Sequence, residues 1–178
     1  LPDGDTVDAG PTSWTRTLGA PTPNYAEVRT QRFEFSGADN SINNIWQSAT
    51  IDISGYPTGV NISVDLSETG TFESSDSITV QYSLNGGPLV YFPVNGIIIN
   101  DFTSAVASVS GLVGSTVQIV VNAHYGSSSP SSELYRIDNV SVASSIPTPT
   151  MFLNSATGLL TTTLSSCTST IMLVPCML

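Results

Sequence analysis

Apolar and polar residues alternate one by one along most of this chain, and this pattern leaves few folds open to it. In residues 60–66, Val, Ile, Val and Leu alternate with Asn, Ser and Asp, and residues 78–84 and 117–123 repeat the pattern. Successive side chains of a β-strand point to opposite faces, so a period of two predicts strands with one buried face. No run of ten residues has the 3.6-residue period of an amphipathic helix. The alternation predicts an all-β chain.

Two local signals fix how neighbouring strands are joined. Residues 78–84 are followed by Asn85-Gly86-Gly87, which tolerate positive φ, and residues 89–92 then return as a partner strand. This arrangement predicts a β-hairpin. In the last alternating segment, residues 135–142, the apolar parity changes between Ile137 and Val140. Such a change predicts a β-bulge around Asp138-Asn139.

The remaining alternating segments complete a predicted antiparallel β-sandwich of the jelly-roll type. They are residues 30–35, 46–53, 97–99 and 105–109. Together with the segments above they predict eight or nine short strands, separated by turns rich in Gly, Pro, Ser and Asn. Short strands at such close spacing are typical of sandwiches and jelly rolls.

Composition divides the chain into three parts. Residues 1–28 are rich in Pro, Gly, Asp and Thr and are predicted to form an extended N-terminal arm, and residues 29–145 form the predicted sandwich. Residues 146–178 are predicted to be a linker followed by an apolar C-terminal segment, because residues 151–178 contain no charged side chain. So apolar a segment is expected to pack on the sandwich, on another subunit or on a following domain.

The charge balance excludes some partners. The chain has a formal net charge of −10 and no lysine, and its four cations are all arginines. Phosphate-tracking surfaces need clustered cations, so we expect no nucleic-acid partner, and docking on anionic lipid is disfavoured. No apolar run is long enough to predict a membrane span. An acidic, lysine-free chain that is rich in Ser and Thr and begins at Leu1 is typical of a processed extracellular or cell-surface protein.

Cysteine usage leaves two alternatives open. Cys167 and Cys176 lie close together near the C-terminus, without the CxxC spacing or the histidines of a zinc site. In an oxidising compartment they are expected to form a local disulfide. The alternative is a pair of small apolar residues in a buried segment.

A family resemblance rests on motifs that occur in order through the predicted sandwich. They are residues 46–48, 51–56, 62–70, 82–87, 100–104, 112–120 and 136–142. These motifs resemble a recurrent β-sandwich module of large secreted surface proteins in Bacteroidota, including proteins exported by type IX secretion. The resemblance implies a jelly roll similar to those of carbohydrate-binding modules, carried as a repeat or appendage of adhesins and secreted enzymes.

No group of residues points to catalysis. Acyl transfer needs a nucleophile beside a base, and glycoside hydrolysis needs two positioned carboxylates. The only imidazole, His124, lies at the end of a predicted strand, and the carboxylates are scattered over turns and strand ends. We therefore expect a binding or structural protein and no enzyme.

Calcium is the one cofactor expected. The resemblance implies a structural calcium ion with one ligand early in the fold and one in the last strand, which here gives Glu34 and Asp138 as candidate ligands. The alternative for Asp138 is a pair with a nearby arginine or a hydrogen bond at the bulge. A second acidic group, Glu68, Glu73 and Asp76, surrounds one turn, and solvated carboxylates are the favoured interpretation there.

Candidate ligand-binding and modification sites are fewer. Sugar recognition needs exposed aromatic rings beside polar groups, and the candidate platforms are Trp14, Tyr56, Tyr91 and Tyr125. Thr6 and Ser77 match an Asp-Ser/Thr-apolar pattern that resembles O-glycosylation acceptors of such bacteria.

Two functions of different classes follow. The first is a structural or adhesive subunit that associates with copies of itself, as a filament or surface layer, through strand exchange or edge pairing of its terminal segments. The alternative is a carbohydrate-binding module of a larger secreted enzyme or adhesin, with a cell-surface polysaccharide as partner. A spacer domain without a ligand is the third.

Overall fold

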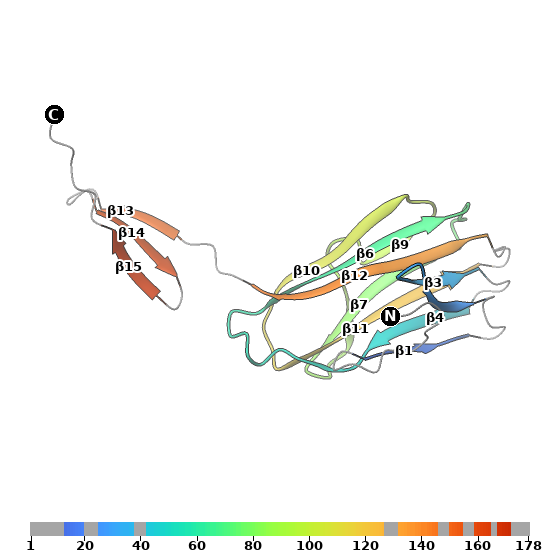
Figure 1. Ribbon diagram of the computed structural model, residues 1–178, viewed down its shortest axis with the longest axis horizontal. Coiled ribbons are helices and arrows are strands. Elements are labelled where there is room, and N and C mark those ends of the chain that lie inside the picture. Colours follow the sequence, from blue (N-terminus) through green and yellow to red (C-terminus); the bar gives the residue numbers. More distant parts are fainter. Residues whose placement is uncertain are drawn as a thin grey trace, which may run out of the picture. The chain divides into compact units, whose positions relative to one another are not determined.

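Two antiparallel β-sheets lie face to face in the first part of the chain (Figure 1). The computed structural model describes residues 13–19, 25–37, 42–126, 132–145, 150–154, 159–164 and 167–171, and for the last three ranges it describes the backbone alone. The chain divides into two compact units, Leu1–Ser144 and Ser145–Leu178. The described residues contain strands and turns and no helix. The prediction of an all-β antiparallel sandwich is confirmed.

The larger sheet has seven strands, of which five follow the order β1-β4-β11-β7-β8, while β5 pairs with β11 and β9 with β7. Its strands are β1 (Trp14–Thr17), β4 (Ile42–Ser48), β5 (Ile51–Asp52), β7 (Ser77–Leu84), β8 (Leu89–Tyr91), β9 (Ile97–Ile99) and β11 (Thr116–Tyr125). The smaller sheet has five strands in the order β10-β6-β12-β3-β2. They are β2 (Ala26–Arg29), β3 (Arg32–Ser36), β6 (Val60–Thr69), β10 (Ser104–Leu112) and β12 (Leu134–Ser144).

The core between the sheets follows the alternation of the sequence. Along β6 the side chains of Val60, Ile62, Val64 and Leu66 are buried, and the residues between them lie on the outer face. Aromatic rings fill the space beneath β1, where Trp46 stacks on Trp14 with ring centroids 4.1 Å apart and on Phe33 at 4.4 Å. These three rings join β1 and β4 of the larger sheet to β3 of the smaller one.

The predicted hairpin and bulge are both confirmed. Strands β7 and β8 pair from Gln81↔Tyr91 to Ser83↔Leu89, and Asn85 and Gly86 in the turn have φ of 54° and 70°. The pairing of β12 with β6 shifts between Asp138 and Ser141, and Asn139 there has a φ of 44°. The extra residue keeps Val140 and Val142 against the core although Tyr135 and Ile137 precede them on odd positions.

The two long sides of the sandwich are built differently. On one side the short strands β8 and β9 form the edge of the larger sheet, and Val94 between them exchanges hydrogen bonds with Ser108 of β10 in the smaller sheet. On the other side β3 pairs with β12 only over Leu134–Ile137. Beyond the bulge, Ser141–Ser144 pairs with β6 alone among the described strands. Val94 thus joins the two sheets on one side. On the other side the Arg16 side chain of β1 donates to the Ala26 carbonyl of β2, and among the described residues the sandwich is open only beside Ser141–Ser144.

The N-terminal arm expected over residues 1–28 contains β1 and most of β2. These two strands are edge strands of the two sheets. The sequence did not predict these strands, because four residues are too few to show an alternating pattern.

Segment 46–53, expected as one strand, is divided between two strands, β4 and β5. Strand β4 begins at Ile42, and between β4 and β5 the backbone N–H of Ala49 donates to the carbonyl of Ser13.

The second unit contains a small antiparallel sheet. Its strands β13 (Thr150–Asn154), β14 (Leu159–Leu164) and β15 (Cys167–Ile171) pair in chain order. The apolar segment thus pairs its backbone groups with one another. Among the described residues there is no helix long and apolar enough to cross a membrane.

Candidate functional site

Tyr125, one of the four predicted sugar platforms, lies in the core. Its side chain has no exposed surface, and its hydroxyl donates a hydrogen bond of 2.8 Å to the carbonyl of Phe35. Burial raises the pKa of the phenol well above its ordinary value. The prediction that this ring is a platform is wrong. The alternation of β11 contains the reason, because position 125 shares the parity of the buried Val117, Ile119 and Val121.

The other three platforms differ in exposure. Trp14 is 6% exposed and stacks on Trp46, so it forms a wall and not a free platform. Tyr91 is 48% exposed on β8, between Val90 and Phe92. Tyr56 is 42% exposed in the loop between β5 and β6. Tyr91 is not among the residues that line the three cavities described below, so Tyr56 is the platform carried forward, with Trp14 as a supporting ring.

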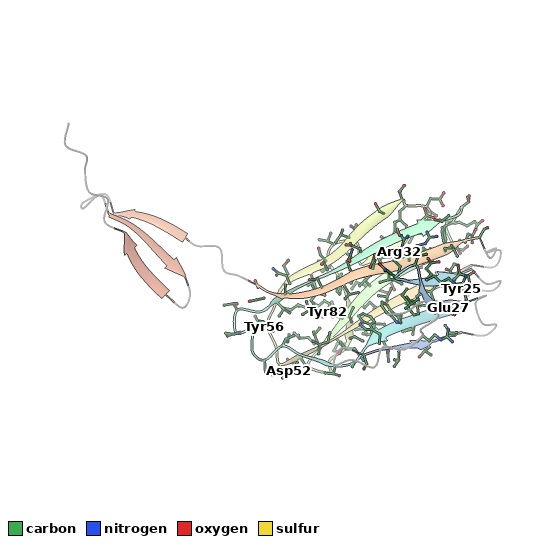
Figure 2. All side chains as sticks on the ribbon, in the orientation of Figure 1. Tyr25, Glu27, Arg32, Asp52, Tyr56 and Tyr82 are labelled. Atoms are coloured by element: carbon green, nitrogen blue, oxygen red, sulfur yellow. The ribbon has the colours of Figure 1, made fainter. Side chains whose placement is uncertain are left out.

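A cavity of about 250 Å³ brings Tyr56 and Trp14 together at the open side of the sandwich. Its other lining residues are Ile51, Asp52, Ile53, Val140 and Val142. Figure 2 shows Tyr56 and Asp52 at the same end of the sandwich, where the β5–β6 loop projects. The lining is apolar except for one carboxylate and one phenol. This is the usual composition of a small-ligand site, in which a few polar groups orient the ligand.

The loop that carries Tyr56 is held by its own backbone. Tyr56 N–H donates to Ile53 at 3.1 Å, and Gly59 N–H donates to Tyr56 at 2.8 Å. Gly59 has a φ of 88°, and a Cβ there would lie 2.8 Å from the carbonyl oxygen of Leu112, so only glycine fits. Because these contacts fix the loop before any ligand arrives, Tyr56 is presented at low entropic cost.

Asp52 supplies the charged acceptor of this cavity. One of its carboxylate oxygens accepts a hydrogen bond of 2.9 Å from the backbone N–H of Ser54. That bond, with a further one from the Ser54 side chain, lowers the pKa of Asp52 below its ordinary value. The carboxylate is consequently ionised at neutral pH and remains a strong hydrogen-bond acceptor.

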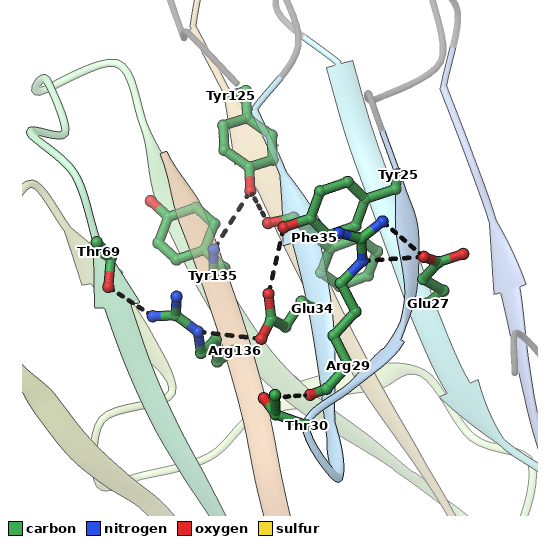
Figure 3. A network of polar contacts seen from close by, with 10 residues as sticks. All are labelled: Tyr25, Glu27, Arg29, Thr30, Glu34, Phe35, Thr69, Tyr125, Tyr135 and Arg136. Atoms are coloured by element: carbon green, nitrogen blue, oxygen red, sulfur yellow. Dashed lines mark hydrogen bonds and ion pairs between the residues drawn. The ribbon is translucent and has the colours of Figure 1, made fainter. Parts of the chain in front are cut away.

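Glu34 and Asp138, the predicted calcium ligands, are engaged with different partners. Glu34 is 5% exposed and lies 3.3 Å from Nε of Arg136, while the Tyr25 hydroxyl donates to its other oxygen (Figure 3). Arg136 also donates to Oγ1 of Thr69. Asp138 accepts from the backbone N–H of Asn139 at the bulge, which is the alternative considered above. Each carboxylate thus has its own partners among the described residues, and calcium at Glu34 and Asp138 stays a prediction.

A different acidic group lies at the end of the sandwich opposite the Tyr56 loop. Carboxylate oxygens of Glu73, Asp76 and Glu133 lie within 4.8 Å of one another. Glu73 and Asp76 belong to the acidic group seen in the sequence, whereas Glu68 is paired across from Tyr135 on β12. A hydrogen bond with Asp76 raises the pKa of Glu73, with smaller contributions from burial and charge repulsion. Carboxylates this close offer the hard oxygen ligands that calcium prefers.

The remaining predicted residues have simpler surroundings. Ring nitrogen Nδ1 of His124 lies 3.1 Å from Oδ1 of Asn43 on the neighbouring strand β4. Ser77, a predicted glycosylation site, is half-buried at the start of β7 and pairs with His124 and Ile99. Thr6 and Cys176 lie outside the described residues, and for Cys167 only the backbone is described. The disulfide and the glycosylation sites remain predictions.

Two further cavities lie along the smaller sheet. One of about 480 Å³ has Arg32, Asp65, Ser67, Ser104, Val106 and Asp138 among its lining residues. The other, of about 320 Å³, is lined by Trp14, Gln31, Arg32, Trp46 and Asn139 among others. Sequence reasoning missed Asp52, Arg32, Asp65 and Glu133. The outward parity of Asp65 on β6 was a visible signal, whereas the other three acquire neighbours only through tertiary pairing.

Comparisons with known proteins give a general likeness. No protein-family model matches the chain, and the comparison with curated proteins gives no match. Among solved structures, a family 4 carbohydrate-binding module is 16% identical, with a TM-score of 0.46, and the match covers 76% of this chain and 88% of that one. A family 61 module in complex with β-1,4-galactotriose is 12% identical, with a TM-score of 0.41 and coverage of 72% and 80%. Neither likeness is close enough to assign a ligand to this chain.

Proposed function

We propose that this chain is a carbohydrate-binding domain whose ligand lies on Tyr56, beside Asp52 and Trp14. The observation that carries the proposal is the exposed tyrosine ring next to an ionised carboxylate in an otherwise apolar cavity of about 250 Å³. A pyranose ring has an apolar C–H face and a rim of hydroxyl groups. The ring of Tyr56 suits the face, and the carboxylate of Asp52 suits two neighbouring hydroxyls.

Size and rigidity agree with this ligand class. Pockets for drug-sized ligands measure about 300–1,000 Å³, so the cavity at Tyr56 suits a ligand as small as one sugar ring. The loop is fixed by Gly59 and by backbone hydrogen bonds, so binding orders little of the protein. We propose an extracellular setting for this domain, in keeping with its lysine-free, acidic composition.

Replacing Tyr56 with alanine tests this function. The platform is lost while the core is untouched, because the ring is 42% exposed. We expect the affinity for any glycan found by array screening to fall at least about tenfold, equivalent to about 1.4 kcal/mol. Isothermal titration calorimetry measures the change.

Tyr91→Ala is the matched control, since its ring is exposed to a similar degree, 48%, on β8. It is expected to bind like the wild type. Equal losses in the two variants, or a glycan array without any signal, would contradict the proposed site.

Self-association through strand exchange or edge pairing of the terminal segments remains a second prediction, and exposed apolar side chains of the sandwich offer an additional contact surface. Leu89, Val90, Val94, Ile97 and Ile99 are each 45–52% exposed around the β8–β9 edge, and apolar patches of this kind are common at protein interfaces. Light scattering of the full chain and of a truncation ending at Ser145 separates the possibilities. If assembly depends on the terminal segment, the full chain should form larger particles than the truncation. Monomers in both samples would exclude assembly.

Calcium also remains a prediction, and Glu73, Asp76 and Glu133 are the residues to test. The raised pKa of Glu73 means that the folded protein favours a proton there, and this stabilisation is lost as pH rises through that pKa. A cation would replace the proton. We therefore expect calcium to raise the melting temperature of chelated protein at neutral pH, and the effect to fade in acid, where protons compete.

Calorimetric titration of the chelated wild type and of Asp76→Asn checks this expectation. The variant is expected to lose the calcium response, whereas Asp138→Asn, at a carboxylate outside the group, keeps it. If calcium gives the wild type neither a heat of binding nor a shift in melting temperature, the calcium prediction is wrong.

A further inference from the structure

Three cavities of the sandwich share lining residues, each with the next. Arg32 and Asp138 line both the 480 Å³ cavity and the 320 Å³ cavity. Trp14 and Val140 line both the 320 Å³ cavity and the 250 Å³ cavity that contains Tyr56. We infer that they form one groove for an extended, uncharged polysaccharide chain, which passes from Ser104 on β10, over β12, to Tyr56. This inference rests on the proposed function and adds the length and the charge of its ligand.

The bulge of β12 explains why the groove can leave the sheet face. Strand β3 pairs with β12 no further than Ile137. Next to this point lies the β2–β3 turn, in which Thr30 and Gln31 both have positive φ. Immediately beyond, Asn139 takes a φ of 44° and β12 continues without a neighbour from β3. The 320 Å³ cavity lies beside this bulge, with Arg32 and Asp138 in its lining together with Trp14.

The outer-face part of the groove is rich in hydrogen-bonding groups. Asp65 and Asp138 are directly opposite each other on β6 and β12. Asn139 binds one oxygen of each, through its backbone N–H to Asp138 and its side-chain amide to Asp65. Among the described residues the second oxygen of each carboxylate has no such bond, so both are placed to accept hydroxyl protons. Like charges directly across a sheet are unfavourable, and here Asn139 already donates to both carboxylates. Hydroxyl donors of a bound sugar would add further hydrogen bonds to the same pair.

Arg32 marks the middle of the groove. It is half-buried and forms no ion pair within the described part of the chain. Its guanidinium offers planar donors to ring and hydroxyl oxygens, next to the acceptors of Asp138. Polar groups of both kinds therefore line this stretch, and the stacked rings of Trp14 and Trp46 follow it.

Charge decides between neutral and acidic polysaccharides. The groove contains Asp52, Asp65 and Asp138 against Arg32, and the chain as a whole has a formal charge of −10. A polyuronate would meet repulsion along the groove and from the rest of the surface. A neutral chain meets none, and its hydroxyls satisfy the carboxylates.

The test compares short and long oligosaccharides of the neutral class that binds on a glycan array. Calorimetry is run with the series from disaccharide to hexasaccharide on the wild type, Tyr56→Ala and Asp65→Ala. We expect wild-type affinity to rise with each added sugar. Tyr56→Ala should weaken every ligand at least about tenfold. Asp65→Ala should weaken the hexasaccharide about tenfold and leave the disaccharide unchanged.

Further variants and an acidic ligand complete the design. Ser104→Trp, at an exposed position of the far end, blocks the groove with a bulky ring while Asp65 and Asp138 stay in place, and should act like Asp65→Ala. Glu27→Gln removes a charge on the same sheet face outside the lining residues and should bind normally. Thermal melts confirm that each variant is folded. Oligogalacturonides should bind more weakly than neutral chains, most of all at low salt.

The outcomes separate this inference from the function beneath it. Affinity that stops rising at the disaccharide, with Asp65→Ala and Ser104→Trp unchanged, would overturn the continuous groove and leave the Tyr56 site standing. Preferred binding of oligogalacturonides would overturn the assignment of a neutral chain. Absence of binding to every sugar would overturn both proposals.

Discussion

Trp46→Ala is expected to lower the free energy of unfolding by about 3–5 kcal/mol, the usual range for removing a large aromatic side chain from a core. Trp46 is 7% exposed and lies between Trp14 and Phe33, with ring centroids 4.1 Å and 4.4 Å away. Its loss leaves a void where the two sheets meet beneath β1. Urea unfolding followed by far-UV circular dichroism measures the change.

Trp46→Phe is the control for this prediction. Phenylalanine keeps a ring in the stack and removes an indole N–H that has no acceptor among the described residues. The loss should therefore be clearly smaller than that of the alanine variant, because less volume is removed from the stack. Equal losses in the two variants would mean that the indole itself, and not the stacking of rings, stabilises this region.

Arg136→Ala has the second large effect, because it leaves Glu34 as a buried charge without its cation. The two side chains are 17% and 7% exposed, and Nε of Arg136 lies 3.3 Å from Oε1 of Glu34. Removing one partner of a buried ion pair typically costs about 3–5 kcal/mol. We expect a loss at the lower end of that range, since the Tyr25 hydroxyl still donates to Glu34. Urea unfolding again measures it.

A double-mutant cycle distinguishes the pair from simple packing. With Glu34→Gln in place, the charge is gone, so Arg136→Ala should cost less than it does in the wild type. The difference between the two costs is the coupling of the pair. If the two changes are additive, Arg136 acts through its hydrogen bond with Thr69 and its aliphatic stem alone.

Period-two alternation predicted most of the sandwich because burial on one face is a local, repeated constraint. It located β6, β7, β11 and β12 within a few residues, and the parity change at Ile137 and Val140 located the bulge. The same reasoning missed β1 and β2, whose four residues are stabilised by pairing with strands that are distant in the sequence. The sequence therefore predicted the long strands, whereas the short edge strands depend on tertiary contacts.

The candidate site was harder to predict, because it is assembled from separate segments. Tyr56 and Trp14 were both candidates, but nothing local showed that they line one cavity with Val140. Glu34 was assigned to calcium through a resemblance, and the pairing of β3 with β12 placed Arg136 opposite it. Glu133 joins Glu73 and Asp76 only when the end of the sandwich forms. Register decides which charges meet, and register is a long-range property.

Two prolines at the β8–β9 edge bear on how this protein behaves at high concentration. Pro88 precedes β8 and Pro93 follows it, and neither has an N–H to offer a neighbouring molecule. Each of the two edge strands is only three residues long, and Val94 is already bonded to Ser108. An intermolecular β-ladder therefore has no continuous template here, despite the exposed aliphatic side chains. Crowded samples should form weak, reversible clusters that strengthen with sulfate, and should not seed ordered fibrils from this edge.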